Sequence, residues 1–193
     1  MKRSGLIILG IVALLAIWAW TGYNGVIGQD ENVKKSWNNV QSEYQKRSDL
    51  VGQLVETVKG VANFEQKTLT DVINARSKAT SINVNANDLT PDKVAQFQKA
   101  QEELKGSLSR LLVVAEQYPQ LKATENFTKL QGQLEGIEND VKTSRNSFNE
   151  AINTYNVKVR SFPVNILAGM FGFKAKEGFK ADAGTEKAPE VKF

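Results

Sequence analysis

The amino-acid sequence predicts an all-α protein, with an N-terminal transmembrane helix followed by an elongated antiparallel bundle of three to four long helices. One observation is an apolar run without charges near the N-terminus. Another is that apolar residues recur at alternating steps of three and four along most of the remaining chain, which is the period of packed helices. Turn signals divide this part into long segments with short connections. We expect an anchor in residues 1–23, a helical bundle in 24–173 and a disordered tail in 174–193.

The apolar run accounts for the predicted anchor. Lys2 and Arg3 precede residues 5–20, which carry no charged side chain. Such a run is either a cleaved signal peptide or an uncleaved anchor. Tryptophans stand where signal peptidase would need small residues, which favours the anchor. Extended through Tyr23, the run would span roughly 28 Å as a helix, close to the thickness of a bilayer core.

Charge asymmetry predicts the orientation of this anchor. The α-amine, Lys2 and Arg3 lie close together on one side, whereas Lys34 and Lys35 on the other side are distant and accompanied by acidic residues. The N-terminus is therefore expected in the cytoplasm and the body outside.

Three glycines recur every third residue beyond the run, at Gly22, Gly25 and Gly28. They fit either a helix-packing face or a loose hinge, and the hinge is favoured because glycine weakens a helix at the water interface.

The first apolar seam of the body begins after Asp30 and is interrupted by Arg47. Its members are Val33, Trp37, Val40, Tyr44, Val51, Leu54, Val58 and Val61. Beyond Gly60 the apolar residues continue in a shifted register, so the helix either kinks or is divided within residues 52–63. The stretch 81–90, rich in asparagine, is the clearest turn in the chain.

The next helix has strong signals at both ends. Thr90, Pro91 and Asp92 supply an N-cap, a proline at the first helical position and an acid in the first turn. The apolar seam that follows consists of Val94, Phe97, Leu104, Leu108, Leu111 and Ala115. The pair Tyr118-Pro119 ends it, because a residue before proline avoids helical geometry.

The longest expected helix runs from Thr124 to Phe162. An apolar residue occurs at every seventh position: Phe127, Leu134, Val141, Phe148, Tyr155 and Phe162. A helix of this length would measure roughly 58 Å, which predicts an elongated bundle.

A short apolar segment, VNILAGMFGF, follows Pro163. Four antiparallel helices would return this segment to the bilayer, whereas three would leave it at the far end. Near the bilayer, Phe171 and Phe173 would contact lipid; otherwise they would fold back on the bundle, which we slightly favour.

Composition excludes several classes of function. The chain contains neither cysteine nor histidine, which removes disulfides, thiol nucleophiles, imidazole bases and the commonest metal ligands. The net charge is only +4 with both signs interleaved, so nucleic-acid binding is not expected. No phosphate-binding loop or nucleophile motif occurs. We therefore expect no enzymatic activity, no cofactor and no metal site.

Charged residues nevertheless fall on or beside the apolar seams. They are Arg47, Glu65, Arg76, Glu116, Glu138 and Arg145. Buried charges are tolerated only when paired, which suggests an internal network that fixes the register of the helices. The alternative is that these side chains reach solvent at the rim of the seams.

Four asparagines form a stripe on the long helix, on the face opposite its apolar seam. They are Asn146, Asn149, Asn153 and Asn156. Asparagine is a mediocre helix former, so the stripe is a candidate partner-binding face. An ordinary solvated surface is the simpler explanation.

Several stretches carry a resemblance to a known family. They are Tyr23-Asn24, the run WNNVQSEYQKRSDLVGQLVETVKGVANFE from Trp37 to Glu65, Ala75-Arg76, RLLVVAEQYPQLKA from Arg110 to Ala123, and ENDVKTSRNSFNEAINTYNVKVRSFP ending at Pro163. In combination they resemble the LemA family of bacterial membrane-anchored helical proteins, over nearly the whole chain up to Phe173.

The chain departs from the family pattern in several places. Ser48 stands where the family often has a second arginine, and Val51-Gly52-Gln53 stands where it often has Ile-Pro-Asn. Phe64 and Phe148 replace a histidine and a tyrosine. Without the proline, Gly52 permits a bend but does not force one. The resemblance implies an anchored helical bundle and supplies no catalytic residue.

Together these observations predict a non-enzymatic, single-pass protein of the bacterial inner membrane. Its bundle would lie on the periplasmic or extracytoplasmic side and bind or scaffold an envelope protein partner, with membrane lipid contacted through the anchor. The alternative is a sensor or regulatory subunit that passes a conformational signal to a membrane partner.

Overall fold

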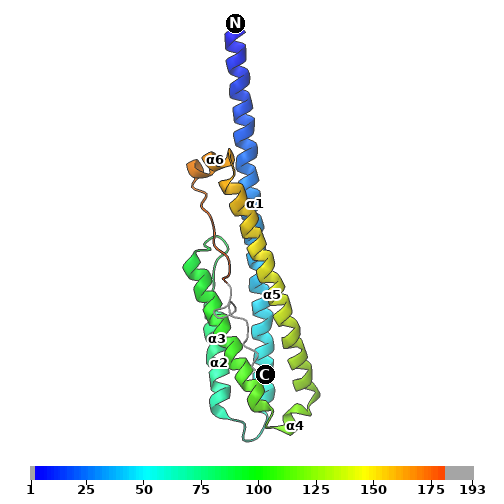
Figure 1. The fold of residues 1–193 in the computed structure, drawn as a ribbon. Coiled ribbons are helices and arrows are strands. Elements are labelled where there is room, and N and C mark those ends of the chain that lie inside the picture. The colour runs from blue at the N-terminus through cyan, green and yellow to red at the C-terminus, as the bar shows by residue number, and fades with distance from the viewer. Residues whose placement is uncertain (1–2, 181–193) are drawn as a thin grey trace, which may run out of the picture.

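The computed structural model describes residues 3–180, and helices account for most of them (Figure 1). They are α1 (Arg3–Lys59), α2 (Gln66–Ser81), α3 (Pro91–Ala115), α4 (Pro119–Lys122), α5 (Glu125–Arg160) and α6 (Val164–Phe171). No β-strand occurs within residues 3–180. The predicted all-α class is confirmed.

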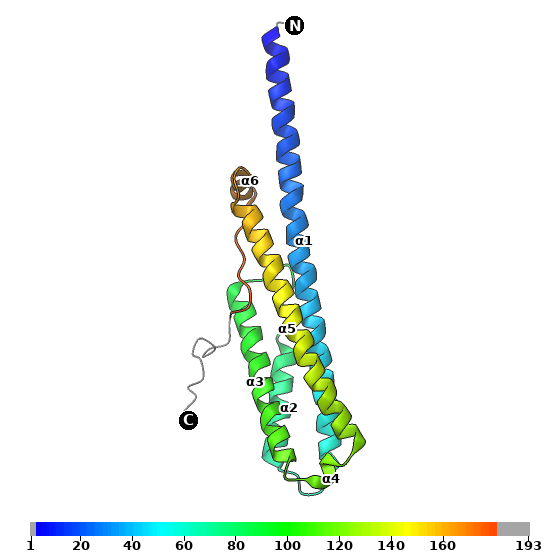
Figure 2. The same ribbon diagram turned by 45° about the vertical axis from the view of Figure 1, so that its right-hand side comes forward.

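The body is an up-and-down arrangement of α1, α2, α3 and α5, as the two ribbon views show (Figures 1 and 2). Helix α1 packs mainly against α5, and α2 packs mainly against α3. The first seam is divided and not kinked, because α1 ends at Lys59 and α2 begins at Gln66. Between them Asn63 adopts a left-handed backbone, φ 62°, a conformation that asparagine tolerates better than most residues. The division gives the bundle four long helices.

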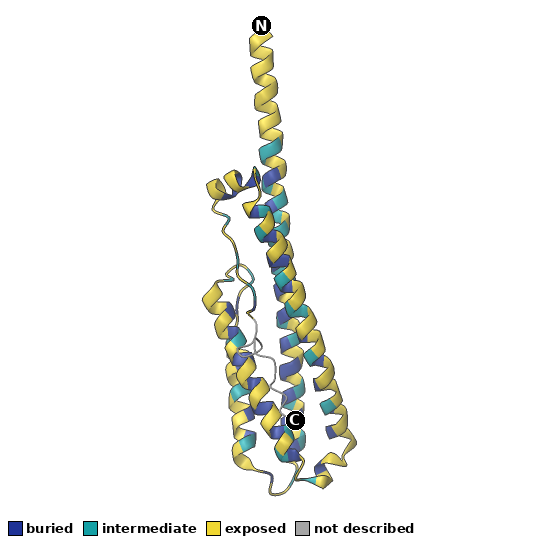
Figure 3. Ribbon diagram, viewed as in Figure 1, coloured by how far each residue is buried: buried dark blue, intermediate teal, exposed yellow. Residues whose placement is uncertain are grey.

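Helix α1 is a single helix of 57 residues that extends far beyond the bundle. Its N-terminal part is exposed on all sides (Figure 3) and is long and apolar enough to cross a membrane. The helix enters the bundle without a break, so the hinge expected at the glycines is wrong. Gly22 instead allows close approach: a Cβ there would lie 2.8 Å from Leu167 Cδ1.

Aromatic rings form the centre of the core. The Trp37 ring lies 5.3 Å from Phe97 on α3 and 5.1 Å from Phe148 on α5, measured between ring centroids. Its Nε1 donates a hydrogen bond to the carbonyl oxygen of Val84, 2.8 Å away, so the buried indole has its polar partner. Trp37 therefore ties α1 to α3, to α5 and to the loop before α3.

Helix α5 follows its predicted seven-residue row until the last member. Phe127, Leu134, Val141, Phe148 and Tyr155 are all buried. Phe162 is 81% exposed, which contradicts its predicted place in the core. The helix ends at Arg160 because the residue before Pro163 is kept out of helical geometry, so Phe162 leaves the row.

After α6 the chain turns back along the bundle. Residues 173–180 form no regular structure, yet they lie against α1 and α5 through several contacts described below. For residues 174–180 the structure thus differs from the predicted disordered tail. The rest of that predicted tail, 181–193, lies outside the described residues.

Truncating Phe148 should destabilise the bundle strongly, whereas truncating Phe162 should not. Phe148→Ala removes a fully buried ring, and we expect a loss of about 3–5 kcal/mol in the free energy of unfolding. Phe162→Ala removes an exposed ring of the same predicted row and should change it by less than about 0.5 kcal/mol. Denaturant unfolding of the full chain in detergent micelles, followed by circular dichroism, measures both. Equal losses would contradict the exposed position of Phe162.

Candidate functional site

The guanidinium of Arg47 is buried in the middle of the bundle. Its side chain is 3% exposed. On α3 it donates to the backbone oxygen and to the side-chain Oε1 of Gln101, at 2.9 and 2.8 Å. On α5 it donates to Glu138 Oε1 at 3.0 Å. Its Cζ also lies 4.9 Å from the centre of the Tyr44 ring. One side chain of α1 thus binds two other helices.

Two further contacts extend this network. Gln101 Nε2 donates to the carbonyl oxygen of Ala79 in α2 at 3.4 Å, and Lys105 Nζ lies 3.3 Å from Glu138 Oε2. The network of Arg47, Gln101, Glu138 and Lys105 therefore reaches all four long helices. Its carboxylate is partly exposed, whereas its arginine and glutamine are buried.

The other charges predicted to join this network lie elsewhere. Arg76 donates from Nε to the carbonyl oxygen of Ser48 at 2.8 Å, and its guanidinium covers Gly52, where a Cβ would lie 3.0 Å from Nη2. Glu65 and Glu116 are exposed at helix ends. These glutamates stay in solvent because each lies where a helix begins or ends, beyond the packed seam.

Gln101 is the member that the sequence analysis missed. It lies between Phe97 and Leu104 at a position where the α3 seam requires an apolar residue. A polar residue interrupting a seam is the same signal that identified Arg47. The two interruptions face each other in the structure: Arg47 Nη2 donates to Gln101, which gives the buried amide oxygen its donor.

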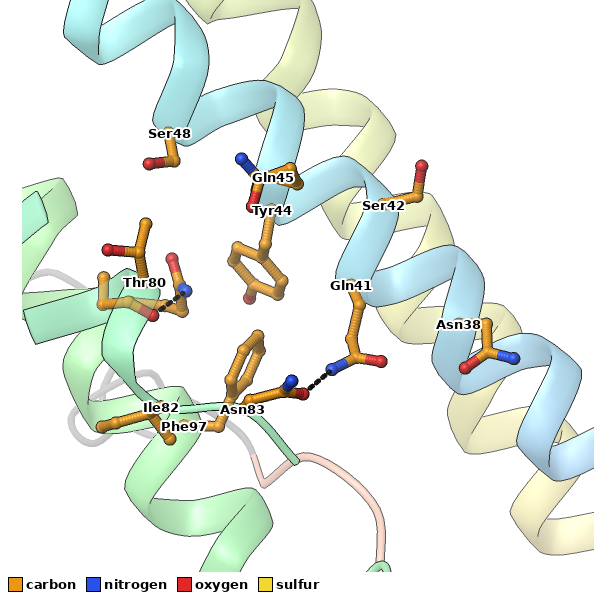
Figure 4. A pocket seen from close by; sticks show the side chains of 12 residues that line it. Asn38, Gln41, Ser42, Tyr44, Gln45, Ser48, Thr80, Ile82, Asn83 and Phe97 are labelled. Carbon is orange, nitrogen blue, oxygen red and sulfur yellow. Dashed lines mark hydrogen bonds between the residues drawn. The ribbon is translucent and has the colours of Figure 1, made fainter. Parts of the chain in front are cut away.

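A pocket of about 460 Å³ lies beside this network, between α1, the end of α2 and α3 (Figure 4). Gln41 and Asn83 point toward one another across it, joined by a 3.2 Å hydrogen bond from Gln41 Nε2 to Asn83 Oδ1. Tyr44 and Phe97 line it with aromatic surface. The lining contains amides and hydroxyls without a base that would activate a nucleophile. Within residues 3–180, no group of three or more acidic side chains forms a possible metal site.

Two asparagines of the predicted partner face bind residues 173–180 of the same chain, which we call the tail segment. Asn156 donates to the carbonyl oxygen of Lys176 and accepts from its amide, both at 2.8 Å. Asn149 does the same with Phe179, at 3.2 and 2.9 Å. Each side-chain amide therefore pairs with one backbone residue as a neighbouring β-strand would.

The spacing of these contacts has a geometric reason. Asn149 and Asn156 are seven residues apart, which is about 10.5 Å along a helix. Lys176 and Phe179 are three residues apart, which is about 10 Å in an extended chain. An extended segment thus meets one residue of α5 at every second helical turn.

Helix α1 contacts the same segment with the same spacing. The Tyr23 and Phe173 ring centroids are 5.7 Å apart, and those of Trp37 and Phe179 are 5.8 Å apart. Between them, Lys176 Nζ lies 2.7 Å from Asp30 Oδ1. Every seventh residue of α1 therefore faces every third residue of the tail segment.

The tail segment thus lies in a groove between α1 and α5, and Phe179 occupies the end of that groove. Its ring is buried against Trp37 and Phe148, and the Arg145 guanidinium carbon lies 4.7 Å from the ring centre. Gly178 makes the approach possible, since a Cβ there would collide with the Asn149 side chain. Arg145, predicted for the internal network, thus contacts the tail segment instead.

Charge strengthens the attachment of the segment. Burial raises the pKa of Asp30, but hydrogen bonds from Lys176 and Lys34 outweigh it, so the pKa lies below its ordinary value. A lowered carboxylate pKa stabilises the folded chain above about pH 4, and that contribution is lost as the pH falls below this range. Burial, followed by the charge of Asp30, raises the pKa of Tyr155, whose hydroxyl donates to the Lys174 carbonyl oxygen at 3.1 Å.

The other two asparagines remain exposed. Asn146 and Asn153 alternate with the two that hold the tail segment. The predicted face is therefore composite: two of its members bind the tail segment, and two lie at the surface beside it.

Replacing Arg47 by methionine should destabilise the bundle by about 1–3 kcal/mol, because Gln101 Oε1 would be left buried without a donor. Lys46→Met removes only an exposed ion pair with Glu43 and should cost less than about 0.5 kcal/mol. Denaturant unfolding of the full chain measures both. Unchanged or higher stability of Arg47→Met, with the topology retained, would show that the network does not fix the register.

Removing the Asn149 side chain should free the end of the tail segment. Asn149→Ala eliminates both hydrogen bonds to Phe179, and we expect the Phe179 amide to exchange about tenfold faster with deuterated water. Asn153→Ala, an exposed neighbour on the same helix, is the matched control. Peptides covering 174–180 report the exchange by mass spectrometry. Equal protection in all three proteins would mean that Asn149 does not hold the segment.

Comparisons with known proteins agree with this architecture. The family model described as LemA family matches residues 36–193. Magnetosome protein MamQ 2 of Paramagnetospirillum magneticum is 24% identical, over 90% of this chain and 70% of that protein. Protein LemA of Metamycoplasma hominis is 23% identical, over 88% of this chain and 77% of that protein. Because the family match covers most of the sequence, from residue 36 within α1 onward, the chain belongs to the LemA family.

Proposed function

We propose that this chain is a non-enzymatic scaffold of the bacterial inner membrane, with its N-terminus in the cytoplasm and its bundle on the extracytoplasmic side. The continuity of α1 carries the proposal. One helix of 57 residues includes both the apolar segment and the Arg47 that binds α3 and α5. A bundle fixed to its anchor in this way holds a partner at a set distance and direction from the bilayer.

The chemistry of the side chains supports binding over catalysis. The sequence has no histidine or cysteine, and the pocket beside the network is lined by amides, hydroxyls and aromatic rings. Neither relative described above is named for a reaction. The groups available here form hydrogen bonds and aromatic contacts, which suit recognition of another polypeptide.

The partner surface that we propose is the face of α5 formed by Asn146, Asn149, Asn153 and Asn156. Two of these residues pair with an extended backbone, and an envelope protein with a similar segment would bind in the same way after displacing the tail. The spacing of the tail contacts defines the sequence that such a segment needs. It would carry an aromatic, a basic and a second aromatic residue, each three positions after the last, as in Phe173, Lys176 and Phe179. Asn146 and Asn153 would add contacts at the rim.

A sensor or regulatory subunit is the second candidate, and the same unbroken helix favours it. A shift of α5 or of the tail segment changes contacts at Tyr23, Asp30 and Trp37, all on α1. A rigid α1 would pass that shift to a partner in the membrane. A flexible Gly-Ser insertion after Gln29 should abolish signalling but leave partner capture intact, which separates the two functions.

Protease treatment of intact spheroplasts tests the proposed topology. The loop of residues 82–90 connects α2 and α3 and is largely exposed, so proteinase K, which cuts exposed loops with little sequence preference, should cleave it from outside. Inverted membrane vesicles should protect the same loop. The opposite pattern would overturn the extracytoplasmic placement of the bundle.

Site-specific photocrosslinking in living cells tests the partner surface. A photoreactive residue at Asn146 or Asn153 should give the same discrete protein adduct, whereas one at the exposed Gln96 of α3 should not. Phe179→Ala should increase the yield at both positions, because it removes the buried ring that holds the tail and leaves all four asparagines in place. Capture of lipid alone, or of nothing, would contradict the scaffold.

A further inference from the structure

Helix α6 lies at the end of the bundle where α1 emerges toward the N-terminus, and it runs crosswise to α1 (Figures 1 and 2). Leu167 sits against Gly22, whose missing side chain provides the space. The Phe171 ring packs edge-on against Tyr23, with 4.8 Å between centroids. The helix is thereby fixed beside the point where the apolar part of α1 ends.

Both faces of α6 are apolar, but only one of them is buried. Val164, Leu167 and Ala168 are buried toward the bundle. The opposite face is also apolar and lies open: Ile166 is 52% and Met170 74% exposed, and Phe162, just before the helix, is 81% exposed. A polypeptide rarely leaves three large apolar side chains uncovered within nine residues, so this patch marks a contact surface.

The position of this apolar patch relative to α1 indicates which surface covers it. If residues 5–23 cross the bilayer, their length of about 28 Å places Gly22 and Tyr23 at the membrane surface. Because α6 contacts these two residues, its exposed face lies at the same level. An apolar helix lying across the membrane normal at this depth is arranged as interfacial helices are.

Basic residues flank the patch. Arg160 and Lys174 are exposed just before and after it, and Lys158 Cε would lie 3.1 Å from a Cβ on Gly25. Positive charge beside apolar side chains favours a bilayer that contains anionic lipids, since headgroup attraction adds to apolar burial.

We propose that α6, together with Phe162, inserts its exposed face into the interfacial layer of the bilayer as a second lipid contact. This inference rests on the proposed membrane-spanning anchor. A single spanning helix leaves the bundle free to rotate and tilt. Two contacts at different points of the body restrict both motions and orient the α5 face relative to the membrane.

Single cysteines provide a direct test, because the natural chain has none. Met170→Cys, Leu14→Cys and Val113→Cys would each carry an NBD fluorophore on the full chain. Val113 is the matched control, an apolar residue that is 64% exposed near the far end of α3. The proteins are reconstituted in phosphatidylethanolamine–phosphatidylglycerol vesicles that contain spin-labelled lipids, with the label either shallow or deep. Circular dichroism checks that each variant keeps its helix content.

The inference predicts several-fold stronger quenching at Met170 than at Val113, with the shallow label more effective. The deep label should quench Leu14. Quenching at Leu14 but not at Met170 would overturn the α6 contact and leave the anchor intact. Quenching at Met170 without quenching at Leu14 would support the contact and overturn the span. A Met170 probe that is shielded from water, unquenched by either lipid and sensitive to protein density would reveal a second copy and overturn the lipid contact.

Discussion

The guanidinium of Arg47 is desolvated where α1 meets α3 and α5, and a buried cation without partners would cost the folded state several kcal/mol. In the observed alignment of the three helices, Gln101 and Glu138 accept from its two terminal nitrogens, whereas its buried Nε–H has no partner. Sliding α5 by a single turn, about 5.4 Å, would carry Glu138 out of reach. Apolar seams tolerate such slips because one aliphatic side chain replaces another, so we propose that this polar contact selects the register.

That register places the features that lie further toward the membrane. Glu138 and Asn149 share α5, about 16 Å apart along its axis. The alignment that pairs Glu138 therefore also sets Phe148 against Trp37 and Asn149 against Phe179. Helix α1 carries the same alignment outward to Asp30 and Tyr23. If the network fixes the register as proposed, the groove for the tail segment and the seat of α6 on Gly22 depend on a contact near the centre of the bundle.

Much of this fold could be predicted from the spacing of apolar residues, because helix packing demands that spacing locally. Arg47 was recognised as an interruption of a seam, and Gln101 satisfied the same criterion. Phe162 kept the seven-residue spacing but not the burial, since Pro163 ends the helix before it. The position of residues 174–180 against α1 and α5 could not be predicted from the spacing of apolar residues. Their lysines and glycine resemble a disordered tail, and the match between asparagines two turns apart and an extended backbone has no local signature.

The tail segment and α6 are linked because one follows the other in the chain. Phe173 contacts Tyr23 next to the Phe171 of α6, and Lys176 and Phe179 then contact Asp30 and Trp37 further down α1. A partner that displaced the Phe179 ring from Trp37 and Phe148 would release the tail segment at the end farther from α6. The loosened segment would still be held by α6 at the bilayer. Because α6 is seated on α1, a displaced tail would stay close to the groove and would compete with the proposed partner at high local concentration. The proposed binding on the α5 face would thus be limited to partners that outcompete an intramolecular segment.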